Sequence, residues 1–242
     1  MKRRILLIKG HSNSNHEEYI MNEYLNYYKI FFESNSGGAF EPDEIKQFKT
    51  PTVQELKDSI SIEKSDFVII VLIGHGATKE DYQLFKISEN TVIKAGQLKI
   101  SAPKQIIIVE SCRSLISKVE PIDLSDKIPL FKDGGIIRMP IDRKKAKELY
   151  NKQIEESNHG IAICFACSKG EEAQDFNFSK SLLQSAFDWH LNIGNNLKVL
   201  KINELMFIVN TKFLELAKKE KALNQNPELI GITDLPFVVS KF

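Results

Sequence analysis

Two long apolar runs in the first half of the chain each end abruptly in polar residues. The first occupies residues 66–73 (DFVIIVLI) and is followed by Gly-His-Gly, and the second occupies residues 105–109 (QIIIV) and is followed by Glu-Ser-Cys-Arg-Ser. Short runs rich in β-branched residues are typical of strands that are buried on both faces. Open α/β sheets place their ligands at the carboxyl ends of such strands. The pattern therefore predicts two central strands whose ends carry chemically useful side chains.

Other segments with regular hydrophobic patterns surround these two runs. Four further short apolar segments predict strands, at residues 4–9, 44–49, 160–166 and 235–239. Four segments have the apolar spacing of helices with one buried face, at residues 16–34, 51–60, 178–191 and 203–223. Strands that alternate with helices predict a parallel α/β sheet with right-handed crossovers.

The connections between these elements differ in character. Thr50 is expected to cap the helix that starts at Pro51, because its hydroxyl can accept a backbone N–H and proline needs no donor there. Between the two central strands, residues 81–87 and 91–94 predict a short hairpin, followed by at most one turn of helix. The polar loop after residues 4–9 contains His11, which is expected near the same edge of the sheet.

Proline, glycine and charged residues are concentrated in the middle of the chain. Residues 117–159 contain three prolines, a Gly-Gly pair and a dense charge cluster, which predicts an exposed connection with one solvated helix. We therefore expect one domain over residues 1–242. It would consist of a larger front part at 1–117, an exposed linker at 118–159 and a smaller back part at 160–242.

Composition restricts the classes of function. The 242 residues are 42% hydrophobic, enough for one large core, and 33 basic side chains balance 32 acidic ones. No overall field recruits nucleic acid or an anionic membrane. The apolar run after Met1 is too short for a signal peptide, and no run is long enough to cross a bilayer. Three cysteines, an odd number, fit a reducing compartment. We expect a cytoplasmic protein with neither a nucleic-acid nor a membrane partner.

A histidine and a cysteine follow the two central strands at equivalent positions. If the strands are parallel neighbours, about 4.8 Å apart, the imidazole of His75 and the thiol of Cys112 can meet. An imidazole can take the proton of a thiol and later pass it to a leaving amine. The amides of Gly76 and Cys112 can then donate to a developing oxyanion. The alternative is a loop histidine beside an inert cysteine, and spacing alone leaves both interpretations open.

At this point the chain resembles the caspase-like cysteine peptidases, the group of caspases, metacaspases and bacterial relatives. The resemblance runs nearly end to end and is carried by residues 4–8, 74–76, 81–85, 109–114, 166–179 and 225–229. It implies a caspase-like fold with a central, mostly parallel six-stranded sheet flanked by helices. It also implies a cysteine endopeptidase in which His75 and Cys112 are catalytic. The implied partner is a protein or peptide substrate, and no cofactor or metal site is implied, although calcium dependence stays open.

Two departures from the family pattern matter. His75 and Cys112 are closer in sequence than the roughly 50 residues of the caspase pattern, which implies a trimmed hairpin. Glu110 stands where caspases that cut after aspartate have glutamine and metacaspases have aspartate. A carboxylate there favours a cationic substrate residue, so we expect cleavage after arginine or lysine. The alternative for Glu110 is a structural ion pair with Arg113.

Further acidic and basic residues bear on this interpretation. Glu171, Glu172 and Asp175 are candidates for the same acidic pocket, or else a solvated acidic loop. Self-cleavage in the linker would have four basic candidates, Arg138, Arg143, Lys144 and Lys145. By resemblance alone, an effector of programmed death or antiviral defence, such as a pore-forming protein, is a candidate substrate.

Three rival interpretations are weighed against the peptidase. One is a catalytically idle caspase-like scaffold that binds a protein partner. Another is a flavodoxin-like receiver or nucleotide-binding domain, for which the first strand end offers only a poor phosphate loop. The third is a redox pair of Cys164 and Cys167, whose spacing fits but whose place along a strand favours core cysteines.

Overall fold

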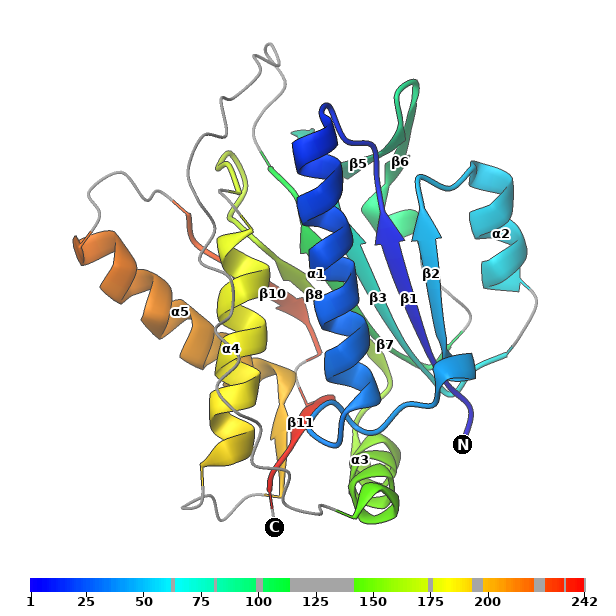
Figure 1. Cartoon of the computed structure of the whole chain (residues 1–242), viewed down its shortest axis with the longest axis vertical. Helices are drawn as coiled ribbons and strands as arrows, with labels where there is room; N and C mark the ends of the chain where they lie inside the picture. The colour runs from blue at the N-terminus through cyan, green and yellow to red at the C-terminus, as the bar shows by residue number, and fades with distance from the viewer. Residues whose placement is uncertain are drawn as a thin grey trace.

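The structure is a computed structural model that describes residues 1–61, 64–80, 82–98, 102–113, 142–173, 176–192, 198–219, 225–232 and 234–241. A six-stranded sheet in the order β10-β8-β7-β3-β1-β2 lies at its centre (Figure 1). The strands are β1 (Arg3–Lys9), β2 (Ile45–Lys49), β3 (Phe67–Ile73), β7 (Lys104–Glu110), β8 (Gly160–Phe165) and β10 (Glu228–Gly231). All neighbouring pairs are parallel except β10 with β8. The prediction of a mostly parallel six-stranded α/β sheet is confirmed.

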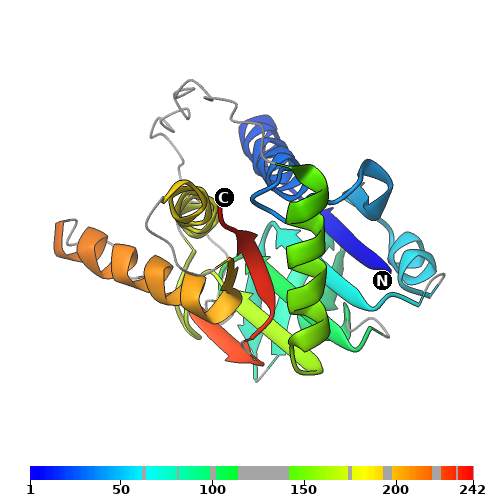
Figure 2. The same ribbon diagram turned by 90° about the horizontal axis from the view of Figure 1, so that it is seen from below.

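Two hydrophobic clusters cover the two faces of this sheet. The first face carries α1 (Asn15–Glu33), α3 (Arg143–Glu156), α4 (Asn177–Leu191) and α5 (Ile202–Lys219), with the small sheet of β9 (Val199–Lys201) and β11 (Pro236–Val239). Figure 2 shows α1 and α4 on the same side of the sheet. The second face carries α2 (Val53–Ser61), the antiparallel sheet of β4 (Gly76–Lys79), β5 (Tyr82–Ser88) and β6 (Thr91–Lys94), and the 3-10 helix η2 (Ala95–Leu98). A further 3-10 helix, η1 (Pro42–Glu44), precedes β2.

The last strand of the central sheet is not the predicted one. The apolar segment at 235–239 forms β11, which pairs with β9 outside the central sheet. The sixth strand is β10, an edge strand whose residues are half-buried or exposed, so no apolar run marks it. β11 is fully buried because α3 and α4 pack against it, and its composition therefore matches that of a central strand. The hairpin at 81–94 is confirmed as β5 and β6, preceded by β4, which the pattern does not predict.

Helix α2 has a different cap from the predicted one. The hydroxyl of Thr52 accepts a hydrogen bond from the backbone N–H of Glu55 at 3.2 Å, and the Glu55 carboxylate accepts one from the N–H of Thr52 at 2.7 Å. This reciprocal pair is a capping box. Thr50 lies outside the helix, with a φ of +52°. The prediction that Thr50 caps this helix is therefore wrong.

The predicted linker at 118–159 ends in a packed helix. The side chain of Asp142 caps α3 by accepting hydrogen bonds from two amides of the first turn. Three side chains of α3 are buried, Ala146, Tyr150 and Ile154. The expectation of a solvated helix is therefore wrong, because this apolar face packs beside β11. Residues 118–141 of the linker lie outside the described ranges.

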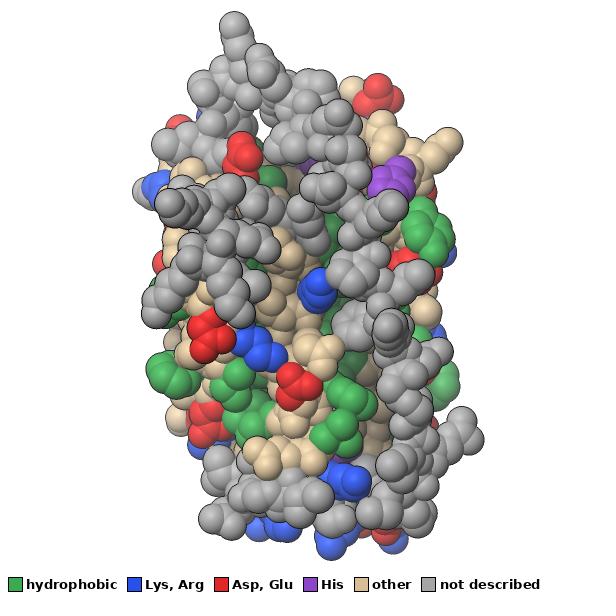
Figure 3. Space-filling model, turned by 60° about the vertical axis from the view of Figure 1, so that its left-hand side comes forward, with side chains coloured by type: hydrophobic (Ala, Val, Ile, Leu, Met, Phe, Trp, Pro, Cys, Tyr) green, Lys and Arg blue, Asp and Glu red, His purple; other side chains and the backbone are tan. Residues whose placement is uncertain are grey.

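The outer face of α4 and α5 is mixed in character (Figure 3). Its exposed large apolar side chains are Phe187, Leu191, Phe207 and Leu214. Among them, Asp188 of α4 pairs with Lys212 of α5 at 3.1 Å. No helix in the described ranges combines the length and the apolar character needed to cross a membrane.

Candidate active site

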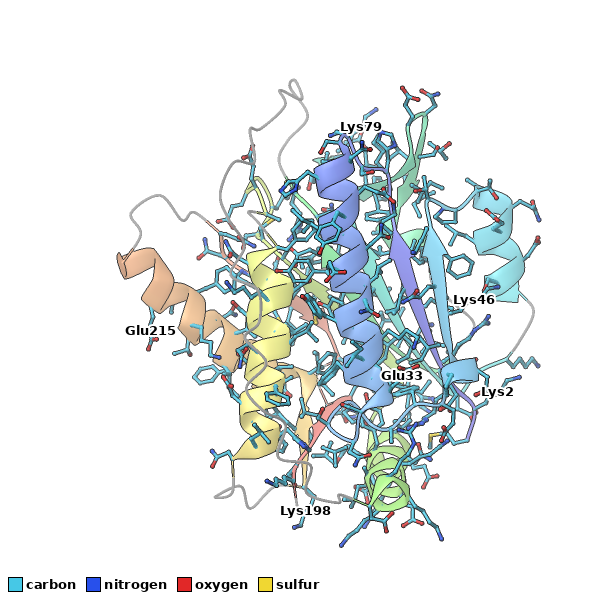
Figure 4. The ribbon with its side chains drawn as sticks, in the orientation of Figure 1. Lys2, Glu33, Lys46, Lys79, Lys198 and Glu215 are labelled. Carbon is cyan, nitrogen blue, oxygen red and sulfur yellow. The ribbon has the colours of Figure 1, made fainter. Side chains whose placement is uncertain are left out.

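The carboxyl edge of the central sheet brings the two chemically useful strand ends together. β3 and β7 pair in parallel with Ile73 opposite Glu110, which confirms the expected pairing. His75 and Cys112 each follow two residues later. This edge is the upper one in Figure 4, where Lys79 is labelled at the end of β4. Since the two strands are level, both side chains leave the sheet at the same place.

The thiol of Cys112 lies against the loop that follows β8. It donates a hydrogen bond to the carbonyl oxygen of Ala173, with an S···O distance of 3.6 Å. Burial raises the pKa of this thiol, and the nearby negative charges of Glu172 and Glu110 raise it further. The thiol is therefore protonated at neutral pH, and it needs a base before it can act as a nucleophile.

The imidazole of His75 is held through one of its two nitrogens. Its Nε2 lies 2.7 Å from Oε1 of Glu17, at the start of α1, and 2.9 Å from the side-chain amide of Asn13. The other nitrogen, Nδ1, makes no hydrogen bond with any residue in the described ranges. Neither Glu17 nor Asn13 is expected from the sequence, although both belong to the polar stretch around His11 that leaves the same edge of the sheet.

Glu17 is an ionised carboxylate in a buried position. Burial by itself works against ionisation, but hydrogen bonds from His75 and from the amide of Asn13, with the charges of His75 and His11, hold the pKa of Glu17 below its usual value. The amide of Asn13 donates to Oε2 at 2.6 Å. A negative charge is therefore fixed beside the candidate base.

Gly76 is packed too closely for any side chain. A Cβ atom at this position would lie 2.5 Å from Oγ of Ser111 and 2.7 Å from the carbonyl oxygen of Leu84. The carbonyl oxygen of His75 accepts a hydrogen bond from the amide of Lys86 at 2.9 Å. Because a trans peptide directs its C=O and N–H to opposite sides, the amide of Gly76 points away from β5. This amide is therefore available to donate to a substrate.

Gln83 of β5 ties the hairpin to the loop that carries the nucleophile. Its side-chain amide donates to Oγ of Ser111 at 3.2 Å and to the carbonyl oxygen of Cys112 at 3.0 Å. Gln83 is buried, with 8% of its surface exposed. A single buried polar residue in an alternating strand gives no signal of this role in the sequence.

Arg113 connects the loop that carries Cys112 to the loop that follows β8. Its backbone N–H donates to the carbonyl oxygen of Glu171 at 3.0 Å, and its own carbonyl accepts from the amide of Gly170 at 3.0 Å. Its guanidinium forms an ion pair with Glu228 and lies 4.1 Å from the centre of the Phe165 ring. The alternative of an ion pair between Arg113 and Glu110 is therefore wrong. The backbone around the thiol is held in place by β5 and by the loop after β8.

Comparison with known proteins identifies the family to which this fold belongs. A family model described as "Caspase domain" matches residues 13–234. The chain belongs to the caspase domain family. Caspase-1 from Spodoptera frugiperda is 13% identical and has a TM-score of 0.56 over 95% of this chain and 88% of that one. The Drosophila initiator caspase Dronc is 9% identical, with a TM-score of 0.54 over 98% and 81% of the two chains. No curated protein sequence gives a match.

Within this caspase domain, Glu110 is a buried group behind the nucleophile. It is 3% exposed, and its Oε2 accepts a hydrogen bond from the backbone N–H of Ser179, in the first turn of α4, at 2.6 Å. Its Oε1 has no hydrogen-bond partner within the described part of the chain. Burial raises the pKa of Glu110 to about 7, against the opposing hydrogen bonds from Ser179. Contact with a basic substrate residue, as expected from the sequence, requires access to this oxygen and stays a prediction.

The raised pKa of Glu110 predicts that the stability of the folded state depends on pH. The pKa of Glu110 rises from 4.5 to about 7 on folding, so the folded state binds the proton more tightly. Below pH 4.5 the contribution of Glu110 to the free energy of unfolding is complete. It falls by roughly 3 kcal/mol as the pH rises to 7. Urea unfolding of Glu110→Gln between pH 5 and 8 should lack this decline. Glu148→Gln, on the exposed side of α3, should keep it, and equal slopes in all three proteins would contradict the assignment.

The other acidic residues differ in availability. Glu171 is fully engaged, since its carboxylate accepts hydrogen bonds from the amide of Ser168 at 3.0 Å and from the amide of Asn226 at 2.8 Å. Glu172 is exposed, and its charge raises the pKa of the Cys112 thiol. Asp175 lies outside the described residues. Of the two acidic-pocket candidates that the structure describes, Glu172 is the one it leaves free near the thiol.

The remaining cysteines are buried core residues. Cys164 and Cys167 are both 0% exposed. Burial raises the pKa of Cys164 well above the ordinary thiol value and that of Cys167 to about 12. Both thiols are therefore unreactive at neutral pH, as expected for core cysteines.

Proposed function

We propose that this caspase-domain protein is a cysteine endopeptidase that uses Cys112 as nucleophile and His75 as base and acid. The observation that carries the proposal is the register of β3 and β7, which brings these two residues to one edge of the sheet. The thiol proton passes to Nδ1 of His75 while the sulfur bonds to the peptide carbonyl carbon. The amides of Gly76 and Cys112 donate to the oxyanion that forms.

The second half of the reaction reverses the proton transfer. The tetrahedral intermediate collapses, the C–N bond breaks, and the leaving amine takes the proton from His75. Water then attacks the thioester, His75 removes one of its protons, and the sulfur of Cys112 leaves and regains a proton. Before the first step the thiol has to leave the carbonyl oxygen of Ala173. A rotation about the Cα–Cβ bond of Cys112 suffices for that.

We propose that cleavage follows arginine or lysine. Two carboxylates support this specificity, the exposed Glu172 and the buried Glu110, both close enough to affect the thiol electrostatically. A cationic side chain placed near the thiol is attracted to both. Family resemblance alone suggests an effector of cell death or defence, such as a pore-forming protein, as the natural substrate.

A cleavage profile on a fluorogenic peptide library tests the proposed function. Peptides ending in arginine or lysine should be cut at least about 100-fold faster than those ending in aspartate or leucine. Glu172→Gln should lower kcat/KM for arginine substrates by about two- to fivefold, as removal of one exposed charge does. Glu148→Gln is the control. A preference for aspartate, or none for basic residues, would overturn the specificity.

The linker residues named as self-cleavage candidates are not equally accessible. The guanidinium of Arg143 binds the carbonyl oxygen of Phe40 at 2.7 Å, and the amides of Lys144 and Lys145 bind the side chain of Asp142. Cuts after these three residues would require α3 to unwind. Arg138, which lies outside the described residues, is the self-cleavage candidate we retain.

The alternative function is a catalytically idle scaffold. It is favoured by one observation, the protonated thiol resting on the carbonyl oxygen of Ala173. A peptide chloromethyl ketone ending in arginine distinguishes the two functions. An active enzyme is labelled at Cys112 much faster than at Cys164 or Cys167, whereas a scaffold shows no such difference.

A further inference from the structure

We propose that Glu17 is a positioning residue of the dyad, which fixes the tautomer of His75 and stabilises its charged form. This inference rests on the proposed function, since it assigns Glu17 a part in the same proton transfer. Neither the caspase fold nor the Cys-His pair by itself requires a carboxylate at this place. The contact between Oε1 of Glu17 and Nε2 of His75, 2.7 Å long, carries the inference.

The contact determines which nitrogen of His75 carries the proton. The Glu17 carboxylate is ionised and can only accept a hydrogen bond, so Nε2 has to carry a hydrogen. In the neutral imidazole, Nδ1 is then the unprotonated nitrogen and the base. The side-chain amide of Asn13 also lies 2.9 Å from Nε2. A half-turn of this amide exchanges its oxygen and nitrogen. With the oxygen toward the ring, Asn13 accepts a hydrogen bond from the same Nε2–H as Glu17.

Glu17 is itself held in one orientation. Ser14 caps α1 by accepting a hydrogen bond from the backbone N–H of Glu17 at 3.2 Å. The other carboxylate oxygen, Oε2, accepts the amide of Asn13 at 2.6 Å, and the Glu17 side chain is only 8% exposed. Each oxygen thus has its own partner, one from the backbone and one from the imidazole. The carboxylate is therefore held with Oε1 toward the imidazole.

A second ion pair stabilises the loop that leads into Glu17. Lys9, at the end of β1, is buried and forms an ion pair with Glu18. Hydrogen bonds from Lys9 and Ser12 hold the pKa of Glu18 at about 2. The loop between β1 and α1 is therefore fastened at both ends, and Asn13 lies within it. The proposed carboxylate sits on a rigid helix start, which suits a positioning role.

The charge of Glu17 matters most when the dyad is charged. Proton transfer from Cys112 converts the neutral imidazole into an imidazolium, which gains a hydrogen-bonded counter-charge from Glu17. Among the described residues, Glu17 contacts the ring and His11, from the same segment after β1, acts electrostatically on Glu17. The level ends of β3 and β7 put Cys112 at the same edge of the sheet. Since burial and nearby negative charges raise the pKa of this thiol, the transfer benefits from such help.

Glu17→Gln tests the proposal, because it keeps the shape and one acceptor oxygen but removes the charge. We expect kcat for an arginine peptide to fall about 10- to 100-fold with KM changed less than about threefold. The acid limb of the kcat/KM profile should move to lower pH, because the imidazolium loses its counter-charge. Glu17→Asp should restore the limb and part of the rate. The proposal is overturned if Glu17→Gln keeps full activity and the acid limb of its profile stays at the same pH. Loss of the folded state in this variant overturns it too.

Glu33→Gln is the matched control at the other end of α1, labelled in Figure 4, where the carboxylate pairs with Lys29. It should behave as the unaltered protein. Alkylation of Cys112 by iodoacetamide, followed by mass spectrometry, separates this inference from the proposed function because it needs no substrate. If no peptide is cut but Glu17→Gln still slows alkylation at least about fivefold, the function fails and the positioning role stands. If peptides are cut and neither rate changes, the positioning role fails alone.

Discussion

Cys112→Ala is expected to reduce peptide hydrolysis by at least about 10⁴-fold, to the level of the uncatalysed background. The substitution removes the only atom that forms the covalent intermediate in the proposed reaction. It should leave the fold intact, because the surrounding backbone is held by Gln83 and by the loop after β8, not by the thiol. Among the described residues, the substitution removes the weak hydrogen bond to Ala173. Hydrolysis of an arginine peptide and a thermal melt measure the two effects separately.

Cys164→Ala is the matched control for this variant. Cys164 is a buried cysteine of β8 in the same hydrophobic cluster as α4, and burial raises its pKa well above the ordinary thiol value. Its loss should lower the melting temperature through a small cavity and leave kcat/KM within about threefold. Retention of activity in Cys112→Ala, or its loss in Cys164→Ala, would refute the proposed nucleophile.

The strand ends of β3 and β7 can be predicted from the sequence because both strands are buried on both faces. Such strands give continuous apolar runs, and the first polar residue marks the edge of the sheet. β10 gives no comparable signal, since it is an exposed edge strand, while β11 gives a misleading one, since it is buried outside the central sheet. Burial, not sheet membership, is what the hydrophobic pattern reports.

The surroundings of the dyad depend on tertiary packing. Glu17 falls in the first turn of α1, where acidic residues are common for electrostatic reasons alone. Its contact with His75 depends on how α1 lies over the end of β3, which local sequence does not determine. Gln83 is similar, because its hydrogen bonds to Ser111 and Cys112 arise only when β5 folds back over the sheet. Glu110 was predictable as a strand-end carboxylate, but its contact with α4 was not.

His75→Ala is expected to lower peptide hydrolysis at pH 7 by about 10³-fold and to change its pH dependence. Without the imidazole, the Cys112 thiol has to lose its proton to solvent. Burial raises the pKa of that thiol, so only a small fraction is ionised at neutral pH. The residual rate, and the rate of Cys112 alkylation, should therefore rise about tenfold per pH unit up to at least pH 8.5. His159→Ala, at the far end of β8, is the control. An alkylation rate in His75→Ala that is as fast as in the unaltered protein at pH 7 would show that His75 is not the base.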